Sequence, residues 1–316
     1  MFIPVKADFK LNRFPVLTTL VCVICALVFF KQQSDRSDFE MSVARYCMKP
    51  QSRIEQMVMS RVDELTDATM CGEAMFHISM ADDPDAAIAE IVQSLKPLSG
   101  FNAEDSREYI TQMLRGELAQ FRTLVPAYPD TKVAYYTGDW NPIGWLTASF
   151  AHDGWGHIIF NLIFFIAFAT TVEALVGPIG FIVFILVNSM LIGLTDSVVS
   201  ALADNHHWSL GLSGVVMGVI GAHAYLLPRG KIRCYYWFIV IFGSVAVPAW
   251  ILAVWFIGSD IWKLFTADNF YGINVLAHVA GGVAGYFYAL FFLKGARLLG
   301  ASLQSDLDKA QFKPGF

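Results

Sequence analysis

Six long apolar stretches constrain this chain more than any other feature of its sequence. They span residues 14–30, 154–176, 179–199, 211–228, 235–257 and 274–293. At about 1.5 Å per residue in a helix, each has roughly the length needed to cross a ~30 Å hydrocarbon layer. Only 16% of the 316 residues are charged, whereas about a quarter are charged in a typical soluble domain. We therefore expect an all-α polytopic membrane protein with a bundle of six transmembrane helices.

Basic residues lie at three ends of these stretches and predict the orientation of the chain. They precede the first stretch and follow the fourth and the sixth: Lys6, Lys10, Arg13, Arg229, Lys231, Arg233, Lys294 and Arg297. With six spans they all fall on one side of the bilayer, which an excess of Lys and Arg marks as the cytoplasm. We expect both termini in the cytoplasm, with the protein in a plasma membrane, the inner membrane of a bacterium.

The first stretch follows basic residues, as the apolar part of a secretory signal peptide also does. The segment LVFFKQQSD at its end contains no small-x-small cleavage site. This favours an uncleaved membrane anchor over a signal peptide.

The segment 31–140 then lies outside the membrane and carries most of the charge. It holds 18 Asp and Glu against 11 Lys and Arg, a net charge of −7, whereas the rest of the chain has a net charge of +2. No basic patch of the kind that binds nucleic acid is present. We expect a cytoplasmic start and first span over 1–30, an extracytoplasmic helical insert over 31–140, a core with spans two to six over 141–297, and a cytoplasmic tail over 298–316.

Three amphipathic patterns in the insert predict helices. One covers residues 52–67; another follows an Asp83 cap with Pro84 at the first helical position; the third starts at Asn102 with acidic residues in its first turn. A small helical subdomain is one interpretation, and helices lying on the membrane surface are the other. The acidic polar faces disfavour the second.

The insert contains two cysteines, Cys47 and Cys71, in a compartment that is oxidising if the orientation holds. We predict a disulfide between them; two free thiols are the alternative.

Three polar clusters interrupt the even-numbered apolar stretches. His157 and Asn161 lie in the second, Ser213 begins the fourth and His278 lies in the sixth. Asn161 lies 16 residues before Gly177, Ser213 lies 16 before Arg229 and His278 lies 16 before Lys294, so that all three sit about 24 Å above the inner face. This shared depth predicts one site. His157 and Asn161, four residues apart, share a helical face.

Serine and histidine suffice for a nucleophile and its general base. Unpaired N–H groups at the start of the fourth span, together with His157 and Asn161, are candidate donors to a developing oxyanion. Gly211 and Gly214 leave room for a substrate backbone to approach Ser213.

A second pair of glycines, Gly281 and Gly285, forms a small-xxx-small face on the sixth span. Such a face lets two membrane helices approach closely. We expect this close approach of the fourth and sixth spans to place His278 next to Ser213.

The three motifs together resemble those of the rhomboid intramembrane serine proteases. HDGWGHIIFN fits the family's H-x4-H-x3-N on the second span, GLSG its G-x-S-G on the fourth, and AHVAGGVAG its A-H-x2-G-x3-G on the sixth. The resemblance covers residues from about Phe14 to Arg297, without the insert. It implies that Ser213 is the nucleophile and His278 the base of a dyad without an acid, and that His157 and Asn161 line the oxyanion site with the Ser213 N–H.

The resemblance also implies substrates and further roles. Single-span membrane proteins are cleaved near the outer face, and substrate enters beside the fifth span and beneath the loop 258–273. Glu173 resembles a family glutamate that forms hydrogen bonds within the core. Met217 stands where many members have a tyrosine that stacks on the histidine. His152 is either a loop residue or a supporting residue of the site.

Other classes of function fit less well. A zinc protease is disfavoured because His152 and His157 are five residues apart and do not form H-E-x-x-H, so we expect no metal and no cofactor. A transporter would show two symmetric halves with broken helices. A non-catalytic rhomboid relative that binds membrane helices or escorts client proteins is the main alternative, although such relatives usually lack the serine or the histidine.

Overall fold

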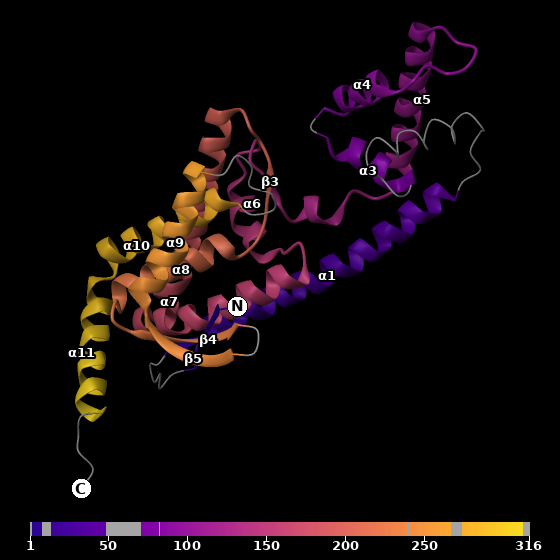
Figure 1. The fold of residues 1–316 in the computed structure, drawn as a ribbon. Coiled ribbons are helices and arrows are strands. Elements are labelled where there is room, and N and C mark those ends of the chain that lie inside the picture. Colours follow the sequence, from indigo (N-terminus) through magenta and orange to yellow (C-terminus); the bar gives the residue numbers. More distant parts are fainter. Residues whose placement is uncertain are drawn as a thin grey trace. The chain divides into compact units, whose positions relative to one another are not determined.

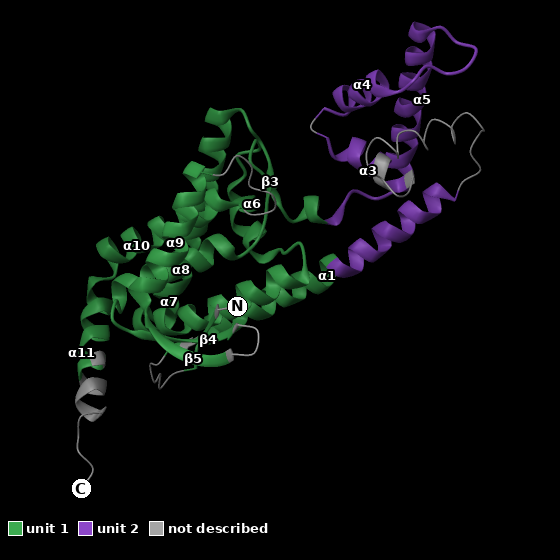
Figure 2. Ribbon diagram, in the orientation of Figure 1, with its two compact units in different colours: residues 1–32, 130–316 green, residues 33–129 purple. Residues whose placement is uncertain are grey.

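The computed structural model describes residues 2–7, 14–48, 71–81, 83–238, 241–266 and 274–311. The chain forms two compact units (Figure 2): Met1–Gln32 with Asp130–Phe316, and Gln33–Pro129. The second unit corresponds to the predicted insert but ends at Pro129 rather than at residue 140. Residues 130–140 belong to the first unit because Tyr135 is buried there and donates a hydrogen bond to Asp196 at 2.6 Å.

Helices dominate the described part of the first unit (Figure 1). In chain order its elements are β1 (Phe2–Ala7), α1 (Val16–Cys47, shared with the second unit), η1 (Pro129–Lys132), β2 (Tyr135–Tyr136), α6 (Pro142–Thr147), η2 (Ala148–Phe150), α7 (Trp155–Ala203), β3 (Trp208–Ser209), α8 (Ser213–Leu226), β4 (Lys231–Phe238), β5 (Ile241–Pro248), α9 (Ala249–Thr266), α10 (Val275–Phe292) and α11 (Lys294–Gln311).

Among the described residues, four helices are long and apolar enough to cross a membrane: α1, α7, α9 and α10. The helix α8 is as apolar but has only 14 residues. The chain is therefore an all-α polytopic membrane protein, as the sequence predicted. The number of six spans stays a prediction.

Helix α7 is bent back on itself at Gly177, which has φ 76° and ψ 167° and precedes Pro178. His157 and Ile192, one from each arm, both contact the segment Gly211–Gly214 at the start of α8. A straight helix would hold these two residues about 50 Å apart. The two arms thus run in opposite directions, and the turn falls where the sequence placed the boundary between the second and third spans.

A three-stranded antiparallel sheet, in the order β1-β4-β5, was not predicted. Cys234 of β4 pairs with Pro4 of β1 on one side and Val245 of β5 on the other. Ile232 and Cys234 are fully buried, whereas Tyr235 and Trp237 are exposed, as alternation along a strand requires. The sheet lies at the end of the unit that also holds the N-terminus and α11 (Figure 1).

The predicted fifth span, 235–257, is therefore wrong in its first half. The apolar run CYYWFIVIF is rich in aromatic and β-branched residues, which favour strands, and hydropathy does not separate a buried strand from a helix. The helix α9 begins directly after Pro248, because a proline inside a helix would remove a hydrogen bond. The predicted loop 258–273 is helical as far as Thr266; residues 267–273 lie outside the described part.

Glu173, near the bend of α7, holds the start of α1. Its carboxylate accepts hydrogen bonds from the Leu17 N–H at 2.9 Å and from the N–H and hydroxyl of Thr18, both at 2.7 Å. The first N–H groups of a helix have no intrahelical partner, and the helix dipole favours a negative charge there. The carboxylate therefore caps α1 from another helix.

The second unit contains α3 (Cys71–Met80), α4 (Pro84–Ser94), α5 (Ala103–Leu124) and the C-terminal half of α1 from Gln33 onwards. The Asp83 side chain caps α4 and the Asn102 side chain caps α5, as predicted. Apolar residues from all four helices form its core: Phe39, Met75, Ile88, Leu114 and Phe121. The remaining predicted helix, 52–67, lies outside the described residues.

Candidate active site

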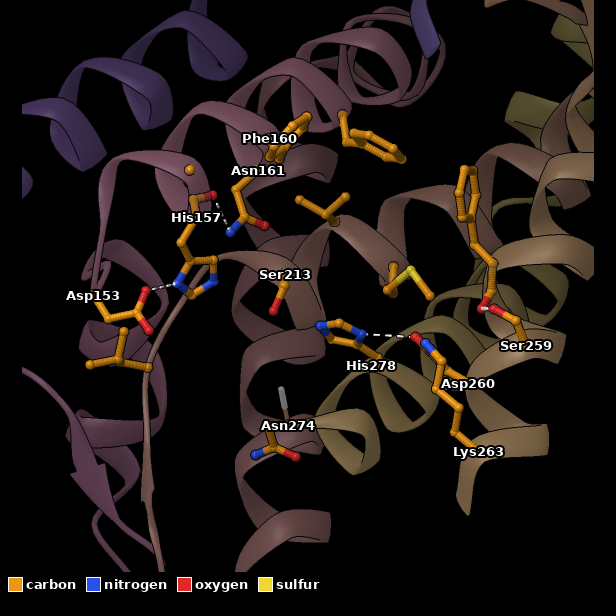
Figure 3. Close-up of a pocket in the computed structure, with 16 residues that line it drawn as sticks. Asp153, His157, Phe160, Asn161, Ser213, Ser259, Asp260, Lys263, Asn274 and His278 are labelled. Atoms are coloured by element: carbon orange, nitrogen blue, oxygen red, sulfur yellow. Dashed lines mark hydrogen bonds and ion pairs between the residues drawn. The ribbon is translucent and has the colours of Figure 1, made fainter. Parts of the chain in front are cut away.

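A cavity of about 510 Å³ lies among α7, α8, α9 and α10 and contains the residues that the motifs singled out. His157, Asn161, Ser213, Met217 and His278 all line it. Aromatic side chains of Phe160, Phe164 and Phe256 form the apolar part of its wall. Residues from three separate apolar stretches of the sequence therefore meet at one place (Figure 3).

Ser213 is the first residue of α8. Its neighbour Leu212 provides no side-chain cap, and the first intrahelical bond runs from the Val216 N–H to the Leu212 carbonyl at 2.9 Å. The N–H groups of Ser213 and Gly214 are thus left without an intrahelical partner. They are available to an anion next to the Ser213 hydroxyl, and the positive end of the helix dipole favours a negative charge there.

Glycines bring α8 and α10 into backbone contact. A Cβ added at Gly281 would lie 2.0 Å from the Gly214 carbonyl oxygen, and one added at Gly285 would lie 2.1 Å from the Gly218 carbonyl oxygen. One turn earlier, a Cβ on Gly214 would lie 3.2 Å from the Ala277 carbonyl oxygen. Gly214 follows Ser213 and Ala277 precedes His278, so this contact holds the serine and the histidine against the same cavity.

His278 directs one ring nitrogen towards Ser213 and the other away from it (Figure 3). The second nitrogen, Nδ1, lies 2.8 Å from the Asp260 Oδ2 atom on α9. Among the described residues no hydrogen bond joins the Ser213 hydroxyl to the His278 ring. In substrate-free sites such bonds are often long and tighten only when substrate binds.

His157 is held from both sides. Its Nδ1 atom lies 2.6 Å from Asp153 Oδ1, one helical turn earlier. Its Nε2 atom would lie 2.8 Å from a Cβ added at Gly211, whose φ of +121° also favours glycine. Gly211 therefore makes room for the His157 ring, whereas the sequence predicted that it makes room for substrate. An ionised carboxylate accepts a hydrogen bond, so Nδ1 of His157 carries a hydrogen, and Nε2 is a donor when the ring carries both hydrogens.

Asn161 lies one turn after His157 on the same face of α7, as its spacing predicted. Its Nδ2 atom donates a hydrogen bond to the His157 carbonyl oxygen at 3.0 Å, which leaves the second hydrogen of the amide group for another acceptor. The side chain is 7% exposed and lines the cavity.

His152 lies outside the cavity wall but packs against it. The side chain is fully buried, and its ring meets the His157 ring edge to face with centroids 5.1 Å apart. Burial, assisted by the neighbouring His157, lowers the pKa of His152 to about 4, so that its ring is neutral. Its backbone N–H donates to Gln32 Oε1 at 3.0 Å and ties this loop to α1.

A family model described as Rhomboid domain matches residues 139–295. The chain belongs to the rhomboid family. A search among curated proteins finds no match. The matched rhomboid domain contains every residue of the cavity wall and excludes the insert.

Two polar side chains of the rhomboid domain were missed by the sequence analysis. Asp260 was placed beyond the predicted end of the fifth span, although a carboxylate in the apolar run VWFIGSDIW is by itself a functional signal. Asn274 caps α10 through the Ala277 N–H and also donates to Asp196 Oδ2 at 2.6 Å and to Ser209 Oγ at 3.0 Å. It thereby anchors the turn that precedes His278.

Asn188 and Asp196, on the second arm of α7, join this helix to its neighbours. Asn188 donates to the Gly281 carbonyl oxygen at 3.1 Å, and its side chain lies against Gly218. Asp196 accepts hydrogen bonds from Tyr135 and Asn274. Both residues support the helices that carry the site.

Proposed function

We propose that this rhomboid-family protein is an intramembrane serine endopeptidase that cleaves single-span membrane proteins. The observation that carries the proposal is that the glycine contact between α8 and α10 holds Ser213 and His278 on one cavity wall. A non-catalytic relative would not need a serine at the uncapped start of a helix, level with a histidine.

In the first step, the Ser213 hydroxyl oxygen attacks the carbonyl carbon of the scissile peptide bond. The His278 ring nitrogen on the Ser213 side accepts the hydroxyl proton and then gives it to the leaving amine as the C–N bond breaks. A water molecule next attacks the acyl carbon on Ser213 while His278 accepts a proton from the water. His278 then gives this proton to the Ser213 oxygen as the ester C–O bond breaks, which releases the carboxyl product and regenerates the serine.

The carbonyl oxygen becomes negative when Ser213 attacks. The donors on this side of the cavity are the N–H groups of Ser213 and Gly214, the remaining Asn161 amide hydrogen and, when the ring carries both hydrogens, His157 Nε2. One such donor is worth about 10²–10³ in kcat in a well-studied serine protease. Asn161→Ala should therefore reduce kcat by about that factor, and an unchanged kcat would remove Asn161 from the oxyanion site.

We propose that the site opens near the outer face of the membrane and that both termini are cytoplasmic. The basic residues Lys231 and Arg233 of β4 and Lys294 and Arg297 of α11 support this, because they follow the ends of α8 and α10 that lie away from Ser213 and His278. Reporter fusions after α11 and within the insert test it: both reporters on the same side of the membrane would contradict it.

We further propose a disulfide between Cys47 and Cys71 in the insert. Gly72, the residue after Cys71, packs against α1 so closely that a Cβ on it would lie 3.6 Å from Cys47 Sγ. The residue after Cys71 therefore lies beside the turn of α1 that carries Cys47. A disulfide between them requires a Cα separation of about 4.4–6.8 Å.

The decisive experiment compares the wild type with Ser213→Ala and His278→Ala, each co-expressed with a single-span substrate. Both variants should accumulate as folded protein and fail to cleave, and only the wild type should react with a serine-directed fluorophosphonate probe. Cleavage that persists in both variants would refute the assignment. Absence of cleavage and of probe labelling in the wild type would favour a non-catalytic helix-binding role.

A further inference from the structure

A carboxylate inside the apolar helix α9 requires a physical explanation. The Asp260 side chain is 7% exposed and lies on a helix that is long and apolar enough to span a membrane. An ionised carboxylate in such surroundings costs several kcal/mol unless it is paired. Its two partners are Lys263 and His278.

The two oxygens of Asp260 have separate partners. Oδ1 accepts from Lys263 Nζ at 2.6 Å, one turn along the same helix, and Oδ2 lies 2.8 Å from His278 Nδ1 on α10. A pair with Lys263 alone would satisfy the charge within α9. The second bond therefore reflects the placement of α9 against α10.

Apolar packing on both sides of α9 fixes this placement. One turn before Asp260, the Ile257 side chain would lie 2.7 Å from a Cβ on Gly282, so the glycine lets α9 approach α10 one turn after His278. The Phe256 ring meets the Phe164 ring of α7 with centroids 5.2 Å apart. Apolar contacts of α9 with α10 and α7 thus help to hold Asp260 beside His278.

The chemistry of a carboxylate determines what this contact does to the ring. An ionised carboxylate only accepts hydrogen bonds, so His278 Nδ1 carries a hydrogen and the opposite nitrogen carries the lone pair. That nitrogen is the one directed towards Ser213 (Figure 3). Lys263, in contact with the other oxygen, favours the ionised carboxylate.

We propose that Asp260 is a positioning residue that holds His278 in the tautomer and orientation of a general base, which makes a Ser213–His278–Asp260 relay from three helices. Asp260 also stabilises the imidazolium that forms when His278 takes the serine proton, because its negative charge lies at the opposite edge of the ring. The inference rests on the proposed protease function and adds an acid to the expected dyad.

The test is steady-state kinetics on purified full-length protein in proteoliposomes with a fluorogenic transmembrane peptide. Asp260→Asn keeps the shape of the side chain and removes the charge. The expected loss in kcat lies between about 10-fold and 10⁴-fold, the upper limit being the loss for the same change in a soluble Ser–His–Asp protease. KM should stay within about twofold of the wild type, since Asp260 acts on the ring and not on substrate. Asp260→Glu, which restores a carboxylate, should be several-fold more active than Asp260→Asn.

Two further variants separate positioning from folding. Thr266→Val is a control on the same helix. The Thr266 hydroxyl donates to the Trp262 carbonyl oxygen within α9, and its removal should leave kcat at the wild-type value. Asp260→Asn combined with Lys263→Met leaves no unpaired charge in α9 and should fold even if Asp260→Asn alone does not. Its kcat should be as low as that of Asp260→Asn.

The outcomes separate this inference from the proposed function. An active Ser213→Ala variant means that the protease assignment itself fails. An inactive Ser213→Ala variant together with a wild-type kcat in Asp260→Asn overturns the relay and leaves the protease intact. Recovery of the wild-type kcat in the double variant also overturns it, because the loss would then come from the unpaired Lys263.

Discussion

A methyl group added at Gly281 should separate the two helices that carry Ser213 and His278. A Cβ on Gly281 lies 2.0 Å from the Gly214 carbonyl oxygen and 2.8 Å from its carbonyl carbon, whereas real Cβ contacts almost never fall below 3.0 Å. The obstacle is backbone, so α10 must move away from α8 by at least about 1 Å. A misplacement of about 1 Å between reacting groups can cost about 10²-fold in rate. We therefore expect Gly281→Ala to lower kcat about 100-fold.

The assay is peptide cleavage in proteoliposomes, with kcat expressed per folded molecule from size-exclusion chromatography. Gly258→Ala is the matched control: it adds the same methyl group to a helical glycine of α9, where no neighbouring heavy atom lies within 4 Å of the new Cβ. A Gly281→Ala enzyme with the same kcat and melting temperature as the Gly258→Ala enzyme would refute the close-contact reasoning.

Three further predictions concern stability. Glu173→Gln should lower the free energy of unfolding by about 1.5–3 kcal/mol, the usual worth of one charged hydrogen bond, with kcat per folded molecule unchanged; an unaltered melting temperature in detergent would contradict the capping role. His207 Nε2 lies 3.4 Å from Asp196 Oδ1, and this carboxylate raises the pKa of His207 above its usual value of about 6.5. The ion pair therefore stabilises the fold at low pH, and this stability is lost as the pH rises through the raised pKa. Melting temperatures measured from pH 5 to 9 should show that fall in the wild type and not in His207→Gln, and parallel curves would count against it. Cys47→Ser should change the mobility of the protein on a non-reducing gel and destabilise the insert by about 2–4 kcal/mol; identical migration of wild type and variant would argue for free thiols.

Local signals in the sequence predicted the elements that depend on neighbouring residues. The Asp83 and Asn102 caps lie within one turn of the helices that they start, and both form as expected. The spacing of His157 and Asn161 places both on the cavity side of α7. These features are readable because the interactions that produce them span only three or four residues.

The prediction of the fifth span failed because a buried strand and a transmembrane helix can have the same hydropathy. The predicted fifth span has the hydropathy of a transmembrane helix, but its first half pairs as strands in a sheet with β1. The aromatic and β-branched composition before Pro248 was the one local indication of strands. Placing the fifth span too early also moved Asp260 out of the predicted membrane segment.

By itself, the sequence determined that this chain is a membrane protein and that α10 has a glycine face, and it predicted one depth for the polar motif residues, since hydropathy, length and helical spacing are properties of single segments. Only the tertiary structure decided which side chains meet. Three features depend on packing between distant segments. They are the bend of α7 at Gly177, the sheet after which α9 begins at Ala249, and the contact between Asp260 and His278, which lie 18 residues apart. No local pattern encodes such packing, because its energy comes from surfaces that exist only after the helices have formed and associated.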